Sequence, residues 1–221
     1  MNQNVLDYAK MQESVCIQND VISNDLFQKL GVNRGLRDAQ GKGVLTGLTN
    51  ISKITAFKMI DGVKTPCDGE LWYRGYPIQT LVKDVLAEGY GFEKTAYLLL
   101  FGELPNAEQL EQFSKIIGES RTLPTNFTRD VIMKAPSKDI MNTMTRSILT
   151  LASYDEDINS QDISTSLGQC IQLISLFPLL AVYAYHAYNH YENNESMYIH
   201  KPNPKLTTAE NLLMMLRPDK S

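Results

Sequence analysis

Apolar and polar positions follow a helical period over the first thirty residues of the chain. Apolar side chains recur at helical spacing from Val5 to Leu30, as expected for helices with one buried face. Polar residues around Asn19 interrupt the pattern, and Gly31 follows it, as glycine commonly does just past a helix. The pattern predicts a helical arm over residues 1–31, divided into two helices.

A glycine-rich polar segment, residues 31–52, is the one place where a phosphate-binding loop is worth testing. Lys42 is followed by Gly43, where the Walker pattern requires Ser or Thr. Gly41, Gly43 and Gly47 do not have the spacing of a dinucleotide-binding loop. We therefore interpret the segment as a long ordered loop in which glycine gives the backbone freedom.

The convincing strand pattern lies between residues 55 and 74. Two runs, Thr55–Ile60 and Glu70–Arg74, favour β structure, and the pairs Asp61-Gly62 and Asp68-Gly69 favour turns. The pattern predicts a small hairpin whose strands are joined by a long loop.

From residue 79 to residue 216 the pattern is helical almost without interruption. The expected helices cover residues 79–88, 91–101, 107–120, 122–133, 138–154, 164–192 and 207–216. Their expected N-caps are Asn106 with Glu108 or Gln109 near the capping-box position, Ser137, and Thr207 or Thr208. An acidic connector precedes the longest helix, in which Pro178 predicts a kink.

The fold predicted from this order is a mainly α, multi-helical domain over residues 32–221, preceded by the arm. The hairpin takes up about 55–74 and the helices about 79–216, without an internal repeat or a clean domain boundary. With 221 residues, 43% of them hydrophobic and 21% charged, the chain is long enough for a sizeable core and has an ordinary globular composition.

Charge and cysteine usage narrow the function classes. The net charge of −4 argues against a nucleic-acid partner, because phosphate binding requires a basic surface. Three scattered cysteines, Cys16, Cys67 and Cys170, predict reduced thiols in a cytosolic protein. The longest apolar stretch, residues 173–185, falls short of the roughly 20 residues that span a bilayer. We expect a cytoplasmic protein without a membrane or nucleic-acid partner.

The histidines are the first candidates for chemistry. His186 and His190 lie four residues apart on one predicted helix, a spacing that can hold zinc. Ala187 follows His186 where a zinc protease has its glutamate base, and His200 lies beyond the helix in a loop. We favour packing or surface roles and expect no metal site, with a zinc-dependent hydrolase as a remote alternative.

Other candidates are weaker. No nucleophile motif is present, and the run Asp155-Glu156-Asp157 is typical of a solvated loop rather than an acid–base pair. Arg74, within WYRGYPI, either binds an anion or stacks on Trp72 or Tyr76 and ties the hairpin to the helices. We favour the structural role for Arg74.

Three strings carry the interpretation further. They are DGELWYRGYPIQTLV, FEKTAYLLLFGELPNAEQLEQF and AYHAYNHYENNESMYIHKPNPKLTTAENLLMML. In this order they resemble the N-terminal region of bacterial citrate synthases, including the family's D-G-x-L-x-Y-R-G-Y-x-I segment. The resemblance runs from about Gly35 to the last residue.

The resemblance implies a portion of the family's large helical domain. It also implies a parent acyltransferase that condenses acetyl-CoA with oxaloacetate to give citrate and CoA, a reaction that feeds the tricarboxylic acid cycle. Such enzymes are homodimers that need no cofactor, since the CoA thioester is a substrate. A portion on its own is expected to expose apolar surface and to associate.

The family's catalytic motifs do not occur in this sequence. The helix reading L-x-L-H-A-x-H-x-x-N, the segment G-P-x-H-G-G-A and the later catalytic histidine and aspartate are all missing. His186, His190 and His200 belong to other segments and inherit no catalytic role. We therefore expect no catalytic residue, leave the substrate-binding residues unknown, and predict that these 221 residues alone are inactive.

Two further alternatives remain open. One is a free-standing helical interaction or regulatory protein that kept the fold and lost catalysis. The other is a portion of a 2-methylcitrate synthase, because the residues that select acetyl-CoA or propionyl-CoA lie in the family's later part. The sequence does not separate a piece cut from a longer protein from a natural truncation, and it does not reveal allosteric control.

Overall fold

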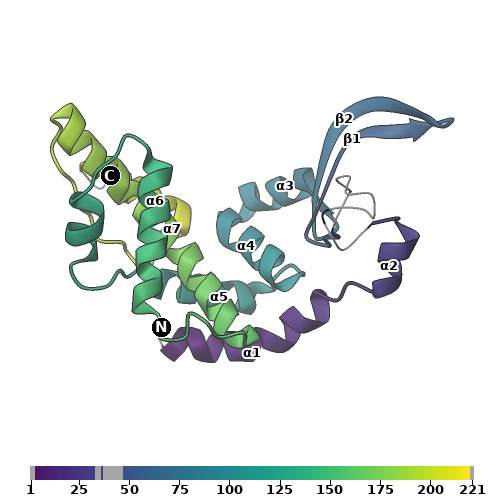
Figure 1. The fold of residues 1–221 in the computed structure, drawn as a ribbon, viewed down its shortest axis with the longest axis horizontal. Helices are drawn as coiled ribbons and strands as arrows, with labels where there is room; N and C mark the ends of the chain where they lie inside the picture. The colour runs from purple at the N-terminus through teal and green to yellow at the C-terminus, as the bar shows by residue number, and fades with distance from the viewer. Residues whose placement is uncertain (1–2, 33–35, 37–46, 220–221) are drawn as a thin grey trace. The chain divides into compact units, whose positions relative to one another are not determined.

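The structure, a computed structural model, describes residues 3–32, 36 and 47–219 (Figure 1). The glycine-rich segment that contains Lys42 and Gly43 lies outside the described residues, so its predicted loop is not tested. The chain divides into two compact units, one formed by Met1–Glu13 with Asn106–Ser221 and the other by Ser14–Pro105. The predicted arm, residues 1–31, is shared between these units, and the assignment of residues 32–221 to one domain stays a prediction.

The unit of residues 14–105 contains the hairpin and two packed helices. Helix α1 (Gln3–Asn19) contributes its residues from Ser14 onward to this unit. The elements that follow are α2 (Asn24–Lys29), β1 (Ser52–Ile60), β2 (Val63–Tyr73), β3 (Tyr76–Pro77), α3 (Ile78–Glu88) and α4 (Gly91–Phe101). The two predicted arm helices and the helices predicted at 79–88 and 91–101 are therefore confirmed.

The hairpin is longer and its turn tighter than predicted. β1 and β2 pair antiparallel, and Ile60 faces Val63 across the two-residue turn Asp61-Gly62. Both turn residues have positive φ, +50° and +79°, as a type I′ turn requires. The long connecting loop was wrong, because the Asp68-Gly69 pair continues β2, where the register shifts between Thr55 and Phe57.

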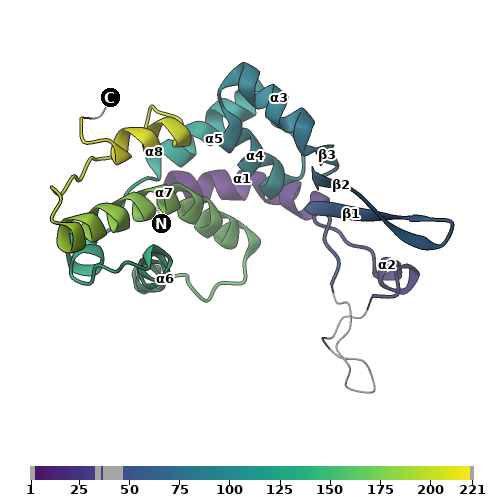
Figure 2. The same ribbon diagram turned by 90° about the horizontal axis from the view of Figure 1, so that it is seen from above.

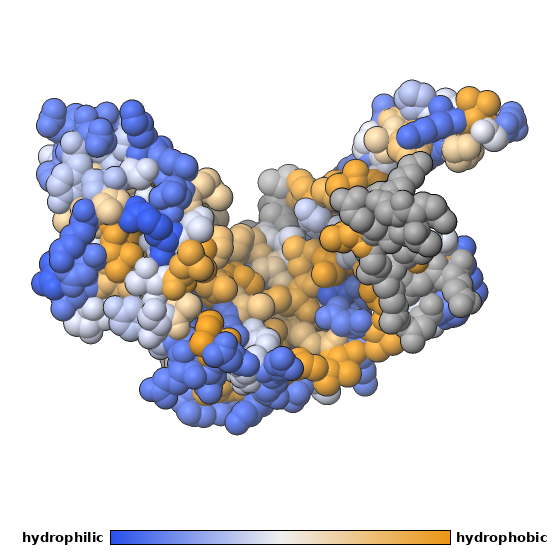
Figure 3. Space-filling model, in the orientation of Figure 1, coloured by the Kyte–Doolittle hydropathy of each residue, from blue (hydrophilic) through white to orange (hydrophobic). Residues whose placement is uncertain are grey.

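Apolar side chains lie at the surface of the hairpin, as the space-filling view shows (Figure 3). The exposed ones include Ile54, Phe57, Met59, Ile60 and Val63. The ammonium of Lys64 lies 3.6 Å from the centre of the Phe57 ring, a cation–π contact across the two strands. The hairpin is therefore held by its ladder and cross-strand contacts, with no buried face along these residues.

The core of this unit forms around α4. Tyr97, Leu98 and Phe101 are fully buried, and the rings of Tyr97 and Phe101 lie 4.5 Å apart. Gly102 ends the helix in the left-handed conformation, and a Cβ there would lie 2.6 Å from the Cβ of Asn19. The helix end that the sequence predicts at Gly102 is thus confirmed, and close packing adds to the backbone reason for glycine.

In the described part of the unit formed by residues 1–13 and 106–221, all regular elements are helices. Its elements after α1 are α5 (Ala107–Glu119), the π-helix η1 (Thr128–Met133), α6 (Ile140–Leu151), the 3₁₀ turn η2 (Ala152–Tyr154), α7 (Ile163–Asn193) and α8 (Thr208–Leu216). Figure 2 shows α6 and α8 beside α7, which contacts both. The mainly α class is confirmed.

Two predicted helix starts were wrong. The helix expected from Thr122 begins only near Thr128, because Asn126 takes a positive φ of +64° that no helix accommodates. The helix expected from Ser137 begins at Ile140 and is capped by Asp139, whose carboxylate accepts from the Asn142 N–H. Both starts were set by loop geometry that the apolar period does not encode.

Other predicted caps are confirmed. Asn106 and Gln109 form a complete capping box at the start of α5, and Thr207 and Glu210 form one at the start of α8. The backbone and hydroxyl of Thr207 both donate to the Glu210 carboxylate, which lowers the pKa of Glu210. These boxes fix helix ends independently of the core.

α7 forms the core of its unit. Its buried face packs with residues of η1 and α8 in a cluster that includes Phe127, Ile132, Leu176, Leu180 and Met215. Among the described residues, α7 is the one helix long and apolar enough to cross a membrane by length and composition alone. The sequence-based length argument against a span was therefore wrong, although more than half of the apolar window is buried against neighbouring helices, as in a core helix.

The N-cap of α7 predicts a pH-dependent stability. Asp162 accepts from the Ser164 hydroxyl, the Thr165 N–H and the Thr165 hydroxyl, and these bonds hold its pKa below the usual range. A lowered folded-state pKa contributes stability above the unfolded-state value of about 3.9 that is lost as pH falls through the folded value. We expect Asp162→Ala to be less stable than the parent chain at pH 7 and the difference to shrink below about pH 4.

Urea unfolding followed by helical circular dichroism at several pH values measures this difference. Asp162→Asn is the matched control, because asparagine keeps a cap acceptor but has no carboxylate to titrate. A gap between Asp162→Ala and the parent that stays constant from pH 7 to pH 3 would show that the charge of Asp162 contributes nothing.

Candidate functional site

The three histidines each face a backbone carbonyl. His186 is buried, with its Nε2 3.1 Å from the Met215 oxygen, and His190 has its Nδ1 2.9 Å from the Glu195 oxygen. His200 has its Nε2 2.9 Å from the Arg217 oxygen. A carbonyl oxygen can only accept, so each of these ring nitrogens carries the proton and donates.

This arrangement assigns the histidines to packing and loop closure. His186 uses its Nε2 to hold the end of α8, which leaves its other ring nitrogen as the one that could ligate a metal. Within residues 3–32, 36 and 47–219, no group of three or more His, Cys, Asp or Glu side chains is placed to hold a metal ion. In the described part of the chain His186 and His190 therefore have no third side chain placed to complete a zinc site, and metal-free function stays a prediction.

The Arg74 side chain joins several segments of its unit by hydrogen bonds. Its side chain is only 4% exposed, and its Nη2 donates to the Leu99 oxygen at 2.9 Å and to the Asp20 carboxylate at 2.9 Å. Nη1 donates to the Asn50 side-chain oxygen at 2.9 Å and to the Asn19 oxygen at 3.3 Å. The predicted tie between hairpin and helices is confirmed, and hydrogen bonds to these acceptors make it.

The remaining sequence candidates lie apart. Cys16 is buried and its thiol faces the Leu100 oxygen at 3.5 Å, whereas Cys170 is exposed. Asp155 accepts from the side chain of Gln169 at 2.8 Å and from the Asp157 N–H at 3.1 Å, so the acidic run stabilises its own loop. None of these contacts forms an acid–base pair.

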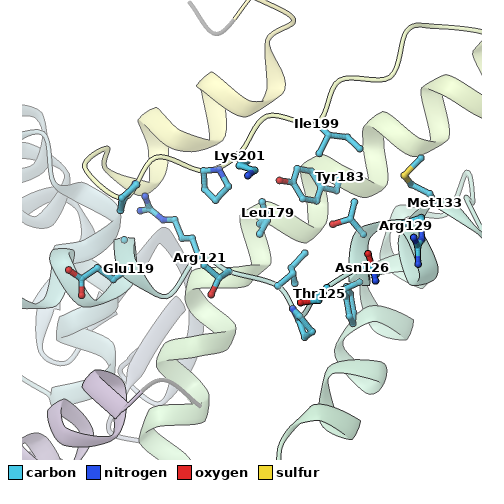
Figure 4. Close-up of a pocket in the computed structure, with 18 residues that line it drawn as sticks. Glu119, Arg121, Thr125, Asn126, Arg129, Met133, Leu179, Tyr183, Ile199 and Lys201 are labelled. Carbon is cyan, nitrogen blue, oxygen red and sulfur yellow. The ribbon is translucent and has the colours of Figure 1, made fainter.

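A pocket in the helical unit was not predicted from the sequence. Its volume is about 980 Å³, and it lies between the segment from α5 to η1, the middle of α7 and the loop before α8 (Figure 4). Its apolar wall is made by Leu123, Phe127, Met133, Leu179, Tyr183, Ile199, Pro202 and Pro204. Small-molecule sites commonly combine such a wall with a few polar groups.

Arg121 forms one end of the pocket and is fixed by its neighbours. The residue is 4% exposed. Its Nη1 donates to the Asn203 oxygen at 3.2 Å and to the Leu206 oxygen at 2.8 Å, and its Nη2 donates to the Thr208 hydroxyl at 3.0 Å. Arg121 therefore holds the 203–208 loop against the end of α5 and shapes the pocket.

Three exposed charged residues, Glu119, Arg129 and Lys201, also line the pocket. Arg129 forms a bidentate pair with Asp130, at 2.9 and 2.8 Å, which raises the pKa of Arg129 and lowers that of Asp130. Lys201 is exposed, and no ion pair of Lys201 is found in the described part of the chain. In Figure 4, Lys201 and Tyr183 lie on one side of the pocket and Arg129 lies toward the other end.

Tyr183 links the wall to the loop. Its hydroxyl donates to the His200 oxygen at 2.9 Å. Burial raises the pKa of Tyr183 to about 12, so the phenol stays neutral at physiological pH. The hydroxyl therefore positions the loop that carries Ile199 and Lys201.

The pocket wall includes irregular backbone. Asn126 is in the left-handed region, and η1 has π-type hydrogen bonding directly after it. π-helical turns are rare and are frequent at functional sites. Sequence reasoning missed this wall because residues 122–133 read as one ordinary helix, and the only local warning was Pro124 followed by the turn-prone Asn126.

Comparison with known proteins decides the family. The family described as "Citrate synthase, C-terminal domain" matches residues 38–221. The chain belongs to the citrate synthase family. A citrate synthase of Saccharolobus solfataricus is 33% identical over 116 residues, which cover 52% of this chain and 28% of that protein. A 2-methylcitrate synthase 1 of Corynebacterium glutamicum is 29% identical over 120 residues, 54% of this chain and 28% of that protein.

Solved structures of citrate synthases share the fold. The Pyrobaculum aerophilum enzyme has a TM-score of 0.61 at 23% identity, and the superposition covers 82% of this chain and 44% of that enzyme's chain. The Thermoplasma acidophilum enzyme, solved as a ternary complex with carboxymethyl coenzyme A and oxaloacetate, has a TM-score of 0.59 at 20% identity. This second superposition covers 89% of this chain and 42% of the Thermoplasma acidophilum chain. The chain thus spans less than half the length of these citrate synthase family members.

Proposed function

We propose that this chain forms part of the helical scaffold of a citrate synthase. The parent enzyme would condense acetyl-CoA with oxaloacetate to give citrate and CoA, and so feed the tricarboxylic acid cycle. We place it in the cytoplasm as a homodimer that needs no cofactor. The observation that carries the proposal is the family match over residues 38–221, supported by the shared fold.

The proposed chemistry explains why scaffold alone is not enough. A carboxylate takes a proton from the methyl group of the acyl-CoA while a histidine stabilises the enol, and a second histidine polarises the keto group of oxaloacetate. The new carbon–carbon bond gives a citryl thioester, and water then cleaves it to citrate and free CoA thiol. Each step requires a positioned acid or base, and His186, His190 and His200 instead donate to backbone carbonyls.

The 221 residues alone are therefore expected to be inactive. Release of thiol from acetyl-CoA plus oxaloacetate is expected to equal the blank without protein. An enzyme with a typical kcat of about 10 s⁻¹ would release thiol visibly within seconds at sub-micromolar concentration. The Saccharolobus solfataricus citrate synthase in the same assay serves as the positive control. Thiol release that rises in proportion to the amount of this chain would contradict the prediction.

The Corynebacterium glutamicum relative favours a second candidate, a portion of a 2-methylcitrate synthase. The two candidates differ in the acyl group, acetyl or propionyl. Reading the coding DNA past Ser221 is the decisive step. A frame that continues into the family's G-P-x-H-G-G-A segment allows the longer protein to be expressed and assayed with both thioesters. A frame that stops favours the interaction or regulatory alternative.

A further inference from the structure

The pocket between η1, α7 and the loop before α8 combines features that no part of the proposed reaction uses. Its wall is largely apolar, its rim carries Lys201 and Arg129, and its shape is held by the buried Arg121. These features come from three separate segments of one compact unit. Their convergence, rather than any single residue, makes the pocket a candidate binding site.

We propose that this pocket binds an organic anion that has an extended apolar body, with its acidic group at Lys201. The site is independent of the proposed citrate synthase activity, because it needs only residues of this chain. The ligand class follows from the apolar wall, the charge at the rim and the size of the pocket.

The charge at the rim favours an anion. Arg121 uses its guanidinium on the Asn203 and Leu206 oxygens and the Thr208 hydroxyl, and Arg129 is neutralised by Asp130. Glu119 is the acidic lining residue, and Figure 4 shows it at the far end of the pocket beside Arg121. Lys201 is the lining cation for which the described residues show no carboxylate partner, so an acidic group at Lys201 lies away from Glu119. An ammonium beside an apolar wall gains most from a ligand that brings its own negative charge.

The wall favours a ligand with an apolar body. Leu179 and Tyr183 form its floor from α7, and Ile199 and Met133 flank it from the loop and from η1. The Tyr183 hydroxyl already donates to the His200 oxygen, so the ring presents apolar surface to a ligand. A highly polar ligand such as a small sugar would leave this surface unused and its own hydroxyl groups unpaired.

The size of the pocket sets a lower bound on the ligand. A volume of about 980 Å³ lies at the upper end of the range for small-molecule sites, so inorganic phosphate or acetate would contact only the rim. A chain of about ten or more carbons gains a hydrophobic contribution along its length, at about 0.8 kcal/mol per fully buried methylene. Dodecanoate is therefore a suitable probe.

Calorimetric titration of the purified chain with dodecanoate below its micelle concentration tests the proposal. We expect saturable binding with about one site per chain. Lys201→Gln is expected to weaken dodecanoate binding about fivefold, the effect of one partly exposed ion pair. Binding of the uncharged dodecanol is expected to be the same in Lys201→Gln and in the parent chain.

Two further variants separate the contribution of the Lys201 charge to dodecanoate binding from that of the apolar wall. Lys205→Gln removes an exposed lysine of the same loop that does not line the pocket, and it is expected to leave dodecanoate binding unchanged. Ile199→Asn places a polar group on the wall and is expected to weaken dodecanoate and dodecanol alike. Ile199 is 45% exposed, so this change does not disturb the core.

Three results would overturn the proposal. The first is that dodecanoate does not bind the parent chain. The second is that Lys201→Gln and Lys205→Gln have equal effects on dodecanoate. The third is that the heat of titration coincides with a change in association state, measured by sedimentation, and is insensitive to Lys201→Gln and Ile199→Asn, because the pocket is then covered by protein. None of these readouts measures citrate synthase activity, so they stand whether or not the citrate synthase proposal holds.

Discussion

Replacing Arg74 with alanine is expected to destabilise the unit of residues 14–105 by about 3 kcal/mol. The guanidinium donates twice to the part-buried Leu99 oxygen, and its removal takes away both of these donors. The Asn19 oxygen loses the guanidinium but keeps the Asn50 side-chain amide as a donor. Each unsatisfied buried acceptor costs about 1–3 kcal/mol, whereas the exposed partner regains water. The cost therefore comes mainly from the Leu99 carbonyl and from the loss of the buried guanidinium's packing, and only weakly from the lost ion pair.

Asp20→Asn is the control that separates these contributions. The Asp20 side chain is 55% exposed, so losing its charge is expected to cost about 1 kcal/mol or less. Arg74→Lys is expected to fall between the two, because one ammonium cannot reach acceptors that a planar guanidinium bridges. If Asp20→Asn costs as much as Arg74→Ala, the ion pair and not the carbonyl network stabilises this unit.

Fluorescence of Trp72 during urea unfolding measures the effect. It is the only tryptophan of the chain and lies in β2, so it reports on residues 14–105 without contribution from the helical unit. Helical circular dichroism followed in parallel shows whether the two units unfold together. The positive φ of Arg74, +46°, adds a backbone cost that all three variants share in direction, so the comparison between them remains fair.

Elements with a local signal could be predicted from the sequence. The capping boxes at Asn106 and Thr207 and the glycine stop at Gly102 depend on residues within one turn of the helix end, and all three are confirmed. The class of fold followed from the helical period over most of the chain. In each case the residues that determine the element lie within the element or next to it in the sequence.

The errors arose where the deciding interaction lies elsewhere. Asp68-Gly69 has the composition of a turn, but it lies within β2 at the register shift, and the residues on both sides of it, Pro66 and Glu70, pair with β1. Ser137 has the composition of a cap, but its hydroxyl accepts from the Asp139 N–H and Asp139 becomes the cap instead. Propensity is a weak prior in such places, because tertiary pairing overrides it.

The candidate pocket was beyond sequence reasoning for the same physical reason. Arg121 and Asn203 are brought together by the return of the chain after α7, and nothing local links them. The family resemblance was recognisable because the strings were collinear and long. The resemblance identified the parent fold. It did not predict the pocket, because the pocket forms where three segments that are distant in the sequence come together.

Gly118 lies close to the backbone of Pro204, in the loop that Arg121 holds, and replacing Gly118 with alanine is expected to destabilise the helical unit. A Cβ at this buried α5 position would lie 2.3 Å from the Pro204 oxygen, far inside contact distance. Alanine improves helix propensity by about 1 kcal/mol over glycine. Overpacking against backbone costs up to about 3 kcal/mol, and Arg121 holds the neighbouring Asn203 and Leu206 carbonyls, so the loop cannot simply retreat.

We therefore expect Gly118→Ala to destabilise the helical unit by about 2 kcal/mol, the clash outweighing the gain in propensity. Gly69→Ala makes the same chemical change where no atom lies within 4 Å, and it is expected to be neutral or slightly stabilising. Urea unfolding followed by circular dichroism measures both. A Gly118→Ala chain as stable as its parent would mean that the 203–206 loop moves without cost.

A double-mutant cycle with Arg121→Met identifies what makes the clash expensive. Once the guanidinium no longer holds the loop, the Pro204 carbonyl can move away from an added methyl group. Gly118→Ala is then expected to cost less in the Arg121→Met background than in the parent, giving a coupling of about 1 kcal/mol. Additive effects would mean that the prolines of the loop, rather than Arg121, keep it rigid. The shape of the pocket wall would then depend on the loop backbone and not on Arg121.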